Sequence, residues 1–202
     1  MMMKDLLLVG GFHEVIELCE SCGRNIVGII DNNIVGDYLG YPILGTDEDA
    51  SSLFNKYGNC ELVVTPDAPS LRKKLVEFYS MIGYCFATII SPSARVSKSA
   101  VICDGVVVQA GVNISSYTKI GKFVKLNTNS NIMHDSVIGD FCTIAPNAVC
   151  LGRVTIGVGS YVGANSTILP EIYIGKNSVV GAGAVVTHNV PSHVTVKGIP
   201  AK

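Results

Sequence analysis

From residue 90 onward, an aliphatic side chain returns at every sixth position of the chain. The members of this series are Ile90, Val96, Ile102, Val108, Ile114, Ile120, Leu126, Ile132, Ile138, Ile144, Cys150, Ile156, Val162, Ile168, Ile174, Val180 and Val186. A small or β-branched residue follows each member by four positions, as at Ala94, Ser130 and Ala184. Neither a helix nor an isolated strand has a period of six. The period is typical of a parallel β-helix, whose equivalent units stack from coil to coil.

The hexads continue from Ile90 to Pro191 without an insertion. We expect the first and fifth positions of each hexad to fill a narrow interior, with three hexads making one triangular coil. Glycine often follows the aliphatic residue, as at Gly121, Gly139 and Gly157. We expect these glycines to supply positive φ angles at the coil corners, where a Cβ would be penalised.

The pattern before residue 90 is different, because short apolar runs alternate there with helical spacing. Strands are expected at 5–11, 25–33, 60–67 and 84–90, and helices at 13–22 and 69–81. Strands that alternate with helices favour a small, parallel, Rossmann-like α/β unit. The sequence therefore predicts two domains, an α/β unit at 1–89 and an all-β parallel β-helix with a C-terminal tail at 90–202.

Ligands of parallel sheets bind at the carboxyl ends of the strands. The residues expected there are Gly10, Gly11, His13, Asp31, Asn32, Thr65 and Asp67. The two glycines would let the backbone approach a phosphate at a helix N-terminus, and Asp31 lies about where a ribose-binding acid is expected. The chain lacks a GxGxxG fingerprint, however, and the same stretch fits a tight turn with a helix cap equally well.

Charge and cysteine content limit the possible partners. The chain has 15 Lys and Arg against 16 Asp and Glu, so its near-zero net charge gives no reason to expect nucleic-acid binding. No apolar run is long enough for a signal peptide or a membrane span. Cys19 and Cys22 lack a second pair at zinc spacing and sit at the end of an expected helix, so we interpret them as packing residues. We expect a cytoplasmic protein with reduced thiols.

The repeats IGKNSV and IGVGSY, with GAGAVV and the closing GIPAK, resemble those of hexapeptide-repeat acyltransferases. Together the two halves resemble the bacterial sugar acetyltransferases of the PglD/NeuD type. That resemblance implies a left-handed β-helix, a homotrimer with acetyl-CoA between adjacent prisms, and an N-terminal unit that holds a nucleotide-linked amino sugar. The family's turn usually reads Gly-His, whereas this chain has GGFHE, with Phe12 before His13.

The segment MHDSVIGDF matches the family segment that carries the catalytic histidine. By this resemblance His134 is the general base and Asp135 its acidic partner. The chemistry agrees, because an amine must lose a proton when it attacks a thioester, and imidazole is suited to accept one near neutral pH. A neighbouring carboxylate favours the imidazolium. His134 occupies the third hexad position, so we expect it to point outward.

One coil beyond His134 lies Gly152, which we expect to offer a backbone N–H to the thioester oxygen, as the family suggests. The rest of the acetyl-CoA site is expected to run along the prism past Thr143, Ala164 and Ala182. The implied reaction is acetyl transfer to the amino group of a UDP- or dTDP-linked 4-amino-4,6-dideoxy sugar, for surface polysaccharide or glycan synthesis.

Three other functions are to be compared with this one. Zinc chemistry, which some hexapeptide prisms perform, needs three converging histidines. His134 is the only histidine of the coils before the last hexad, and His188 and His193 are interpreted as surface residues, so no metal is expected. O-acetylation of a sialic acid or related sugar would use the same base. A non-catalytic trimer that binds nucleotide sugars would not need the His-Asp pair.

Overall fold

The N-terminal unit is built on a six-stranded sheet of order β3-β4-β2-β1-β5-β6. In the computed structural model, which describes residues 4–202, its strands are β1 (Leu6–Val9), β2 (Ile26–Ile30), β3 (Asp37–Tyr38), β4 (Tyr41–Gly45), β5 (Glu61–Val64) and β6 (Cys85–Phe86). Neighbouring strands are parallel except β3 and β4. The four apolar runs thus form strands as predicted, and β1 is buried along its whole length.

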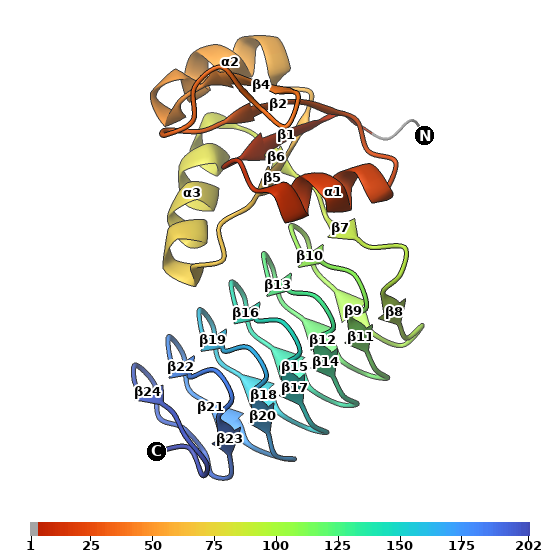
Figure 1. Cartoon of the computed structure of the whole chain (residues 1–202), viewed down its shortest axis with the longest axis vertical. Coiled ribbons are helices and arrows are strands. Elements are labelled where there is room, and N and C mark those ends of the chain that lie inside the picture. Colours follow the sequence, from red (N-terminus) through yellow and green to blue (C-terminus); the bar gives the residue numbers. More distant parts are fainter. Residues whose placement is uncertain (1–3) are drawn as a thin grey trace.

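Helices cover both faces of this sheet. They are α1 (His13–Ser21), the 3-10 turn η1 (Asp47–Asp49), α2 (Ala50–Tyr57) and α3 (Pro69–Ile82). Helix α1 packs on one face, between the sheet and the first coils of the β-helix, while α2 and α3 pack on the other (Figure 1). Cys19 is buried in α1, and the Cys22 thiol donates a hydrogen bond to the Ile90 carbonyl, as expected of packing residues.

Residues from 89 onward form a triangular prism with three flat sheets. Face I holds β7 (Ile89–Ile90), β10 (Val107–Val108), β13 (Lys125–Leu126), β16 (Thr143–Ile144), β19 (Tyr161–Val162), β22 (Val179–Val180) and β24 (Thr195–Val196). Face II holds β8 (Arg95–Val96), β11 (Asn113–Ile114), β14 (Asn131–Ile132), β17 (Val149–Cys150), β20 (Thr167–Ile168) and β23 (Val185–Val186). Face III holds β9 (Val101–Ile102), β12 (Lys119–Ile120), β15 (Val137–Ile138), β18 (Thr155–Ile156) and β21 (Tyr173–Ile174). We name the edges after the faces they join.

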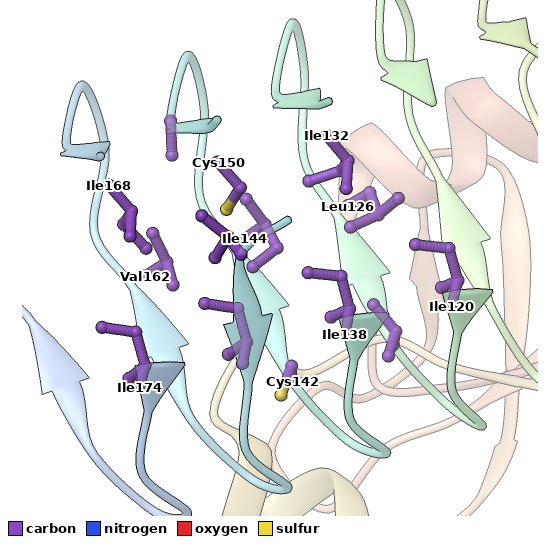
Figure 2. Packing of buried hydrophobic residues seen from close by; sticks show 14 of the residues in the cluster. Ile120, Leu126, Ile132, Ile138, Cys142, Ile144, Cys150, Val162, Ile168 and Ile174 are labelled. Atoms are coloured by element: carbon purple, nitrogen blue, oxygen red, sulfur yellow. The ribbon is translucent and has the colours of Figure 1, made fainter. Parts of the chain in front are cut away.

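The predicted register is confirmed. Each strand pairs in parallel with the strand three hexads later, as Ile114 does with Ile132, and the pairing has no slip from β7 to β23. The aliphatic side chains stack in columns through the interior (Figure 2). At the fifth hexad position, the buried Ser136 and Ser160 hydroxyls each donate to a carbonyl of the following coil. Ser136 and Ser160 therefore fit the core because their hydroxyls are hydrogen-bonded, whereas the buried Ser130 hydroxyl has no partner among the described residues.

The expected role of the hexad glycines is wrong. Gly121 and Gly139 do not have positive φ; the positive angles fall two residues later, at Phe123 (+55°) and Phe141 (+60°). The glycines are small for another reason, since a Cβ on Gly139 would lie 2.7 Å from the backbone nitrogen of Val158 in the next coil. Close approach of stacked backbones, and not corner geometry, selects glycine there.

Two buried cations attach the α/β unit to the prism. Arg72, at 2% exposure, donates to carbonyls on both sides of the interface, among them those of Pro66 and Phe141. Burial lowers the pKa of Arg72 to about 10, against the opposing effect of Asp67, so it stays charged at neutral pH. Lys125 lies on β13 and donates to the Thr65 carbonyl and to the Asp67 carboxylate. Strand β5 and the loop after it are therefore fixed over face I.

Candidate active site

His134 and Asp135 lie at the edge between faces II and III, in the turn from β14 to β15. Asp135 has a φ of +59°, and backbone hydrogen bonds hold this turn on both sides. The Asp135 N–H donates to the Ser116 carbonyl one coil before, and the His134 carbonyl accepts from Arg153 one coil after. The pair therefore sits on a rigid support.

The two side chains form an ion-pair geometry that points outward, as predicted. His134 Nδ1 lies 2.8 Å from Asp135 Oδ2, and both side chains are about half exposed. Because a carboxylate only accepts hydrogen bonds, Nδ1 carries the proton. In the neutral tautomer with the proton on Nδ1, the other ring nitrogen, Nε2, has the lone pair that a general base needs.

Gly152 lies directly against this ring. A Cβ on Gly152 would be 2.7 Å from both Cε1 and Nε2 of His134, so only glycine leaves the ring in this position. Among residues 4–202, no hydrogen bond uses the Gly152 N–H. A free base nitrogen and a free backbone donor are therefore neighbours at this edge.

A polar cavity opens beside the pair, toward the α/β unit. It has a volume of about 320 Å³ and is lined mainly by face II, with Arg95, Asn113, Ser116 and Met133 among its residues. Sequence reasoning did not identify these residues. The only signal for the polar residues among them is that polar residues repeat at equivalent hexad positions, which also suits an ordinary exposed face.

The expected nucleotide-sugar residues gather at the carboxyl ends of β1, β2 and β5. The buried Thr65 hydroxyl donates to the carbonyls of Val9 and Gly10, and a Cβ on Gly10 would lie 2.5 Å from the Thr65 oxygen. Thr65 therefore supports the glycine turn, and its hydroxyl faces the backbone of that turn. His13 begins α1 and is exposed.

Asp31 holds two turns together. Its Oδ2 accepts from the Gly11 N–H, and its Oδ1 accepts from the N–H groups of Asn33 and Ile34. Burial alone would raise the pKa of Asp31, but these three hydrogen bonds outweigh it and lower the pKa below its ordinary value. The carboxylate is therefore charged at neutral pH and already fixes the shape of the turn.

A cavity of about 180 Å³ adjoins these turns. Asp31, Asn32 and Asp47 are on its polar side, and Pro66, Leu71 and Leu75 are on its apolar side. Asn32 Nδ2 donates to Asp47 Oδ2, and Asn32 Oδ1 accepts from the Asp47 N–H. Asp47 was missed by sequence reasoning because it belongs to a segment without a clear periodic pattern.

Phe12 is packed inward and leaves the exposed part of the turn to His13. The Lys125 ammonium lies 4.8 Å from the centre of the Phe12 ring, and the ring packs against the α1 side of the core. Burial lowers the pKa of Lys125, while the carboxylate of Asp67 raises it. Phe12 therefore stands before His13, where the family usually has glycine, and its ring packs over the buried Lys125 ammonium.

The expected acetyl-CoA residues fall into three places. Gly152 is at the edge between faces II and III, whereas Ala164 and Ala182 follow β19 and β22 at the edge between faces I and II. The expectation for Thr143 is corrected. Its side chain is fully buried, donating to the Asp67 carbonyl and accepting from Arg72, so it has no surface for a ligand.

Two expected absences concern the residues that the structure describes. Within 4–202, no cluster of three or more His, Cys, Asp or Glu side chains could hold a metal ion. No helix in this range is long and apolar enough to cross a membrane. His188 and His193 are exposed, as expected.

Comparison with known proteins agrees with this fold. The family of bacterial transferase hexapeptide repeats matches at residues 117–152 and 153–188. Perosamine N-acetyltransferase from Caulobacter crescentus, solved with CoA and GDP-perosamine, is 32% identical with a TM-score of 0.93, covering 98% of this chain and 96% of that chain. No curated protein matches the sequence significantly.

Two further structures are similar over their whole length. The acetyltransferase domain of PglB from Neisseria gonorrhoeae, solved with acetyl coenzyme A, is 28% identical with a TM-score of 0.91, covering 100% of this chain and 99% of that chain. WeeI from Acinetobacter baumannii is 30% identical with a TM-score of 0.90, covering 98% of each chain. The chain therefore belongs to the bacterial hexapeptide-repeat sugar N-acetyltransferases, with a Rossmann-like unit followed by a left-handed β-helix.

Proposed function

We propose that this enzyme moves the acetyl group of acetyl-CoA to the amino group of a nucleotide-linked 4-amino-4,6-dideoxy sugar. The observation that carries the proposal is the contact between the His134 ring and Gly152. With Nδ1 donating to Asp135, Nε2 of the neutral ring would be free to act as the base, and among residues 4–202 the backbone N–H of the adjacent Gly152 has no acceptor.

These groups account for each proton and charge of the transfer. As the amine attacks the thioester carbonyl, a C–N bond forms and His134 Nε2 accepts a proton from the nitrogen. The carbonyl oxygen becomes an oxyanion, which the Gly152 N–H stabilises by a hydrogen bond. When the C–S bond breaks, the imidazolium returns the proton to the departing CoA thiolate. Asp135 stabilises the imidazolium between these steps.

We propose that the working enzyme is a homotrimer. Gly152 and the alanines Ala164 and Ala182 lie on different edges of one prism, with face II between them. Packing the edge between faces I and II of one copy against the edge between faces II and III of the next would join these residues in one acetyl-CoA site. Such an interface is heterologous, because it joins two different surfaces of successive copies, and heterologous interfaces can close into a ring such as a trimer.

The acceptor site also requires a second copy in this proposal. Gly10, Gly11 and His13 would hold the diphosphate at the N-terminus of α1, with Asp31 and Asn32 toward the nucleoside. These residues lie with the α/β unit over face I, whereas His134 lies at the edge between faces II and III. A sugar held by one α/β unit would thus meet the histidine of a neighbouring prism.

The product would be an N-acetylated nucleotide sugar for a surface polysaccharide or glycan. We place the reaction in the cytoplasm, since all seven cysteines are free thiols, which is typical of a reducing compartment.

The test is a panel of acceptors, with release of the CoA thiol as the readout. The panel contains GDP-, UDP- and dTDP-linked 4-amino-4,6-dideoxy sugars, the matching free amino sugars and free sialic acids. We expect turnover with at least one nucleotide-linked amino sugar and a mass increase of one acetyl group on its nitrogen. Turnover with a free sialic acid alone would replace the proposal by O-acetylation. Absence of CoA release with every acceptor would leave a binding protein.

A further inference from the structure

We infer that Asp47 selects the nucleobase of the acceptor, and that the base is guanine. The inference rests on the proposed function, because it assumes that the cavity at Asp31 and Asp47 receives the nucleoside end of a nucleotide sugar. It then assigns that nucleoside from the chemistry of the cavity wall.

Asp47 is held in one orientation by two partners. The hydroxyl of Tyr79 donates to Oδ1 at 2.6 Å, and Asn32 Nδ2 donates to Oδ2 at 2.7 Å. Tyr79 is fully buried on α3, and burial together with the hydrogen bond to Asp47 raises the pKa of its phenol. The phenol therefore remains a donor, and the carboxylate is oriented before any ligand arrives.

The carboxylate still has unused acceptor capacity. Each carboxylate oxygen has two lone pairs, and each receives one side-chain hydrogen bond from the protein. None of the ion pairs among residues 4–202 involves Asp47. A partly buried carboxylate without a cation calls for N–H or O–H donors, and a pair of adjacent donors suits its two oxygens.

The cavity around Asp47 fits a flat base better than a phosphate. Pro66, Leu71 and Leu75 give it an apolar wall, and its volume is about 180 Å³. The carboxylates of Asp31 and Asp47 both line it and would repel a phosphate. The diphosphate is then directed to the other end of the turn, where the N-terminus of α1 begins at His13.

Among the common bases, guanine has two adjacent donors on its Watson–Crick edge, N1–H and the 2-amino group. Uracil and thymine have one N–H between two carbonyl oxygens, so a carboxylate would face an acceptor as well as a donor. A paired contact of this kind discriminates against the wrong base, and binding GDP about 10- to 100-fold more tightly than UDP or dTDP is expected.

Calorimetric titration of the intact protein with GDP, IDP, UDP and dTDP tests the inference. IDP keeps N1–H but lacks the 2-amino group, so it isolates one of the two contacts. The wild type is expected to bind GDP most tightly, IDP more weakly and the pyrimidine nucleotides weakest. Asp47→Asn should reduce the preference for GDP over IDP and over UDP, because an amide offers one acceptor and one donor.

Two variants make the result specific to the Asp47 carboxylate. Glu48→Gln removes the same charge from the exposed neighbour of Asp47 and should leave the order of affinities unchanged. Tyr79→Phe keeps the carboxylate but removes the donor that orients it, so a partial loss of the GDP preference is expected. Thermal unfolding of each variant shows whether the α/β unit has remained folded.

The outcomes separate this inference from the proposed function. If UDP or dTDP binds as tightly as GDP, the assignment to guanine is overturned, while acetyl transfer to a pyrimidine-linked amino sugar would leave the proposed function standing. If Asp47→Asn keeps the full preference for GDP, another group reads the base. If no nucleotide binds and only free amino sugars are acetylated, both are wrong.

Discussion

At the residue scale, the site depends on three neighbours along two coils. Asp135 fixes the tautomer of His134, and Gly152 leaves the space that the ring occupies. The side chains of His134 and Asp135 add nothing to the stacked interior, where Ile132 and Ser136 are fully buried on either side of them. Substitutions at His134 and Asp135 can therefore be expected to change catalysis without changing the fold.

His134→Asn is expected to keep the fold and the oligomer while turnover falls by roughly 10²- to 10⁴-fold, the usual contribution of a general base. Asp135→Asn should lose less, because the amide can rotate to present its oxygen to Nδ1. Steady-state kinetics with both substrates saturating measures this, and acetyl-CoA affinity should be little changed. Near wild-type turnover in His134→Asn would remove the mechanism but not the fold.

Gly152→Ala is expected to act through the histidine. The new methyl group would lie 2.7 Å from the ring, so the ring must move, and a small misplacement of a catalytic group costs on the order of 10²-fold in rate. On a His134→Asn background the same substitution should add little, which a double-mutant cycle measures. Independent, additive losses in the cycle would show that Gly152 acts without His134.

At the element scale, turns and not strands carry the residues proposed to bind the nucleotide sugar. The turns after β1 and β2 are joined by Asp31, whose carboxylate receives three backbone N–H groups. The loop after β5 is fixed to face I by Arg72 and Lys125. The β-helix thus supports the α/β unit and the turns at the carboxyl ends of its strands (Figure 1).

Asp31 gives a pH-dependent prediction. Its pKa is lower in the folded protein than the ordinary 3.8, so its stabilisation is complete above that value and is lost as the pH falls through the folded pKa. Asp31→Asn should therefore lower the urea midpoint at pH 7, and the difference from wild type should shrink below pH 3.8. A difference that stays constant down to the acid limit would mean that the charge of Asp31 does not hold the turn.

At the scale of the whole molecule, the two candidate sites of one chain lie on different parts of its surface. The α/β unit presents its cavity over face I, and the His-Asp pair lies at the edge between faces II and III. In the proposed homotrimer, a second copy brings its α/β unit to the histidine.

Mixed trimers test this arrangement. Asp31→Ala removes a residue proposed to bind the nucleotide, and His134→Asn removes the proposed general base. Each variant alone should therefore be nearly inactive at low acceptor concentration. Unfolding and refolding an equal mixture should restore about a quarter of the wild-type activity, the share of sites that combine an intact half from each neighbour. Mixed oligomers that remain as inactive as the separate variants would place the whole site within one chain.

The sequence alone determined the architecture of the prism, because a strict six-residue period leaves no other regular structure that buries the recurring aliphatic side chains, as it does from Val108 to Val186 except at Cys150, where a thiol takes the same buried position. It also located His134, which a six-residue register places on the outside. The reason for glycine at the second hexad position could not be predicted from the sequence. It lies in the close approach of backbones in adjacent coils, between residues 18 or 19 positions apart, as for Gly139 and Val158.

Only the tertiary structure decided which residues meet. Thr143 reads as one more hexad residue, yet docking of α3 buries it beneath Arg72. Asp47 lies in a segment with no periodic pattern, and it becomes a candidate because Tyr79, 32 residues later, orients its carboxylate. Local repetition fixes a β-helix because each hexad contacts its own copies, whereas a binding site depends on unlike segments that packing alone brings together.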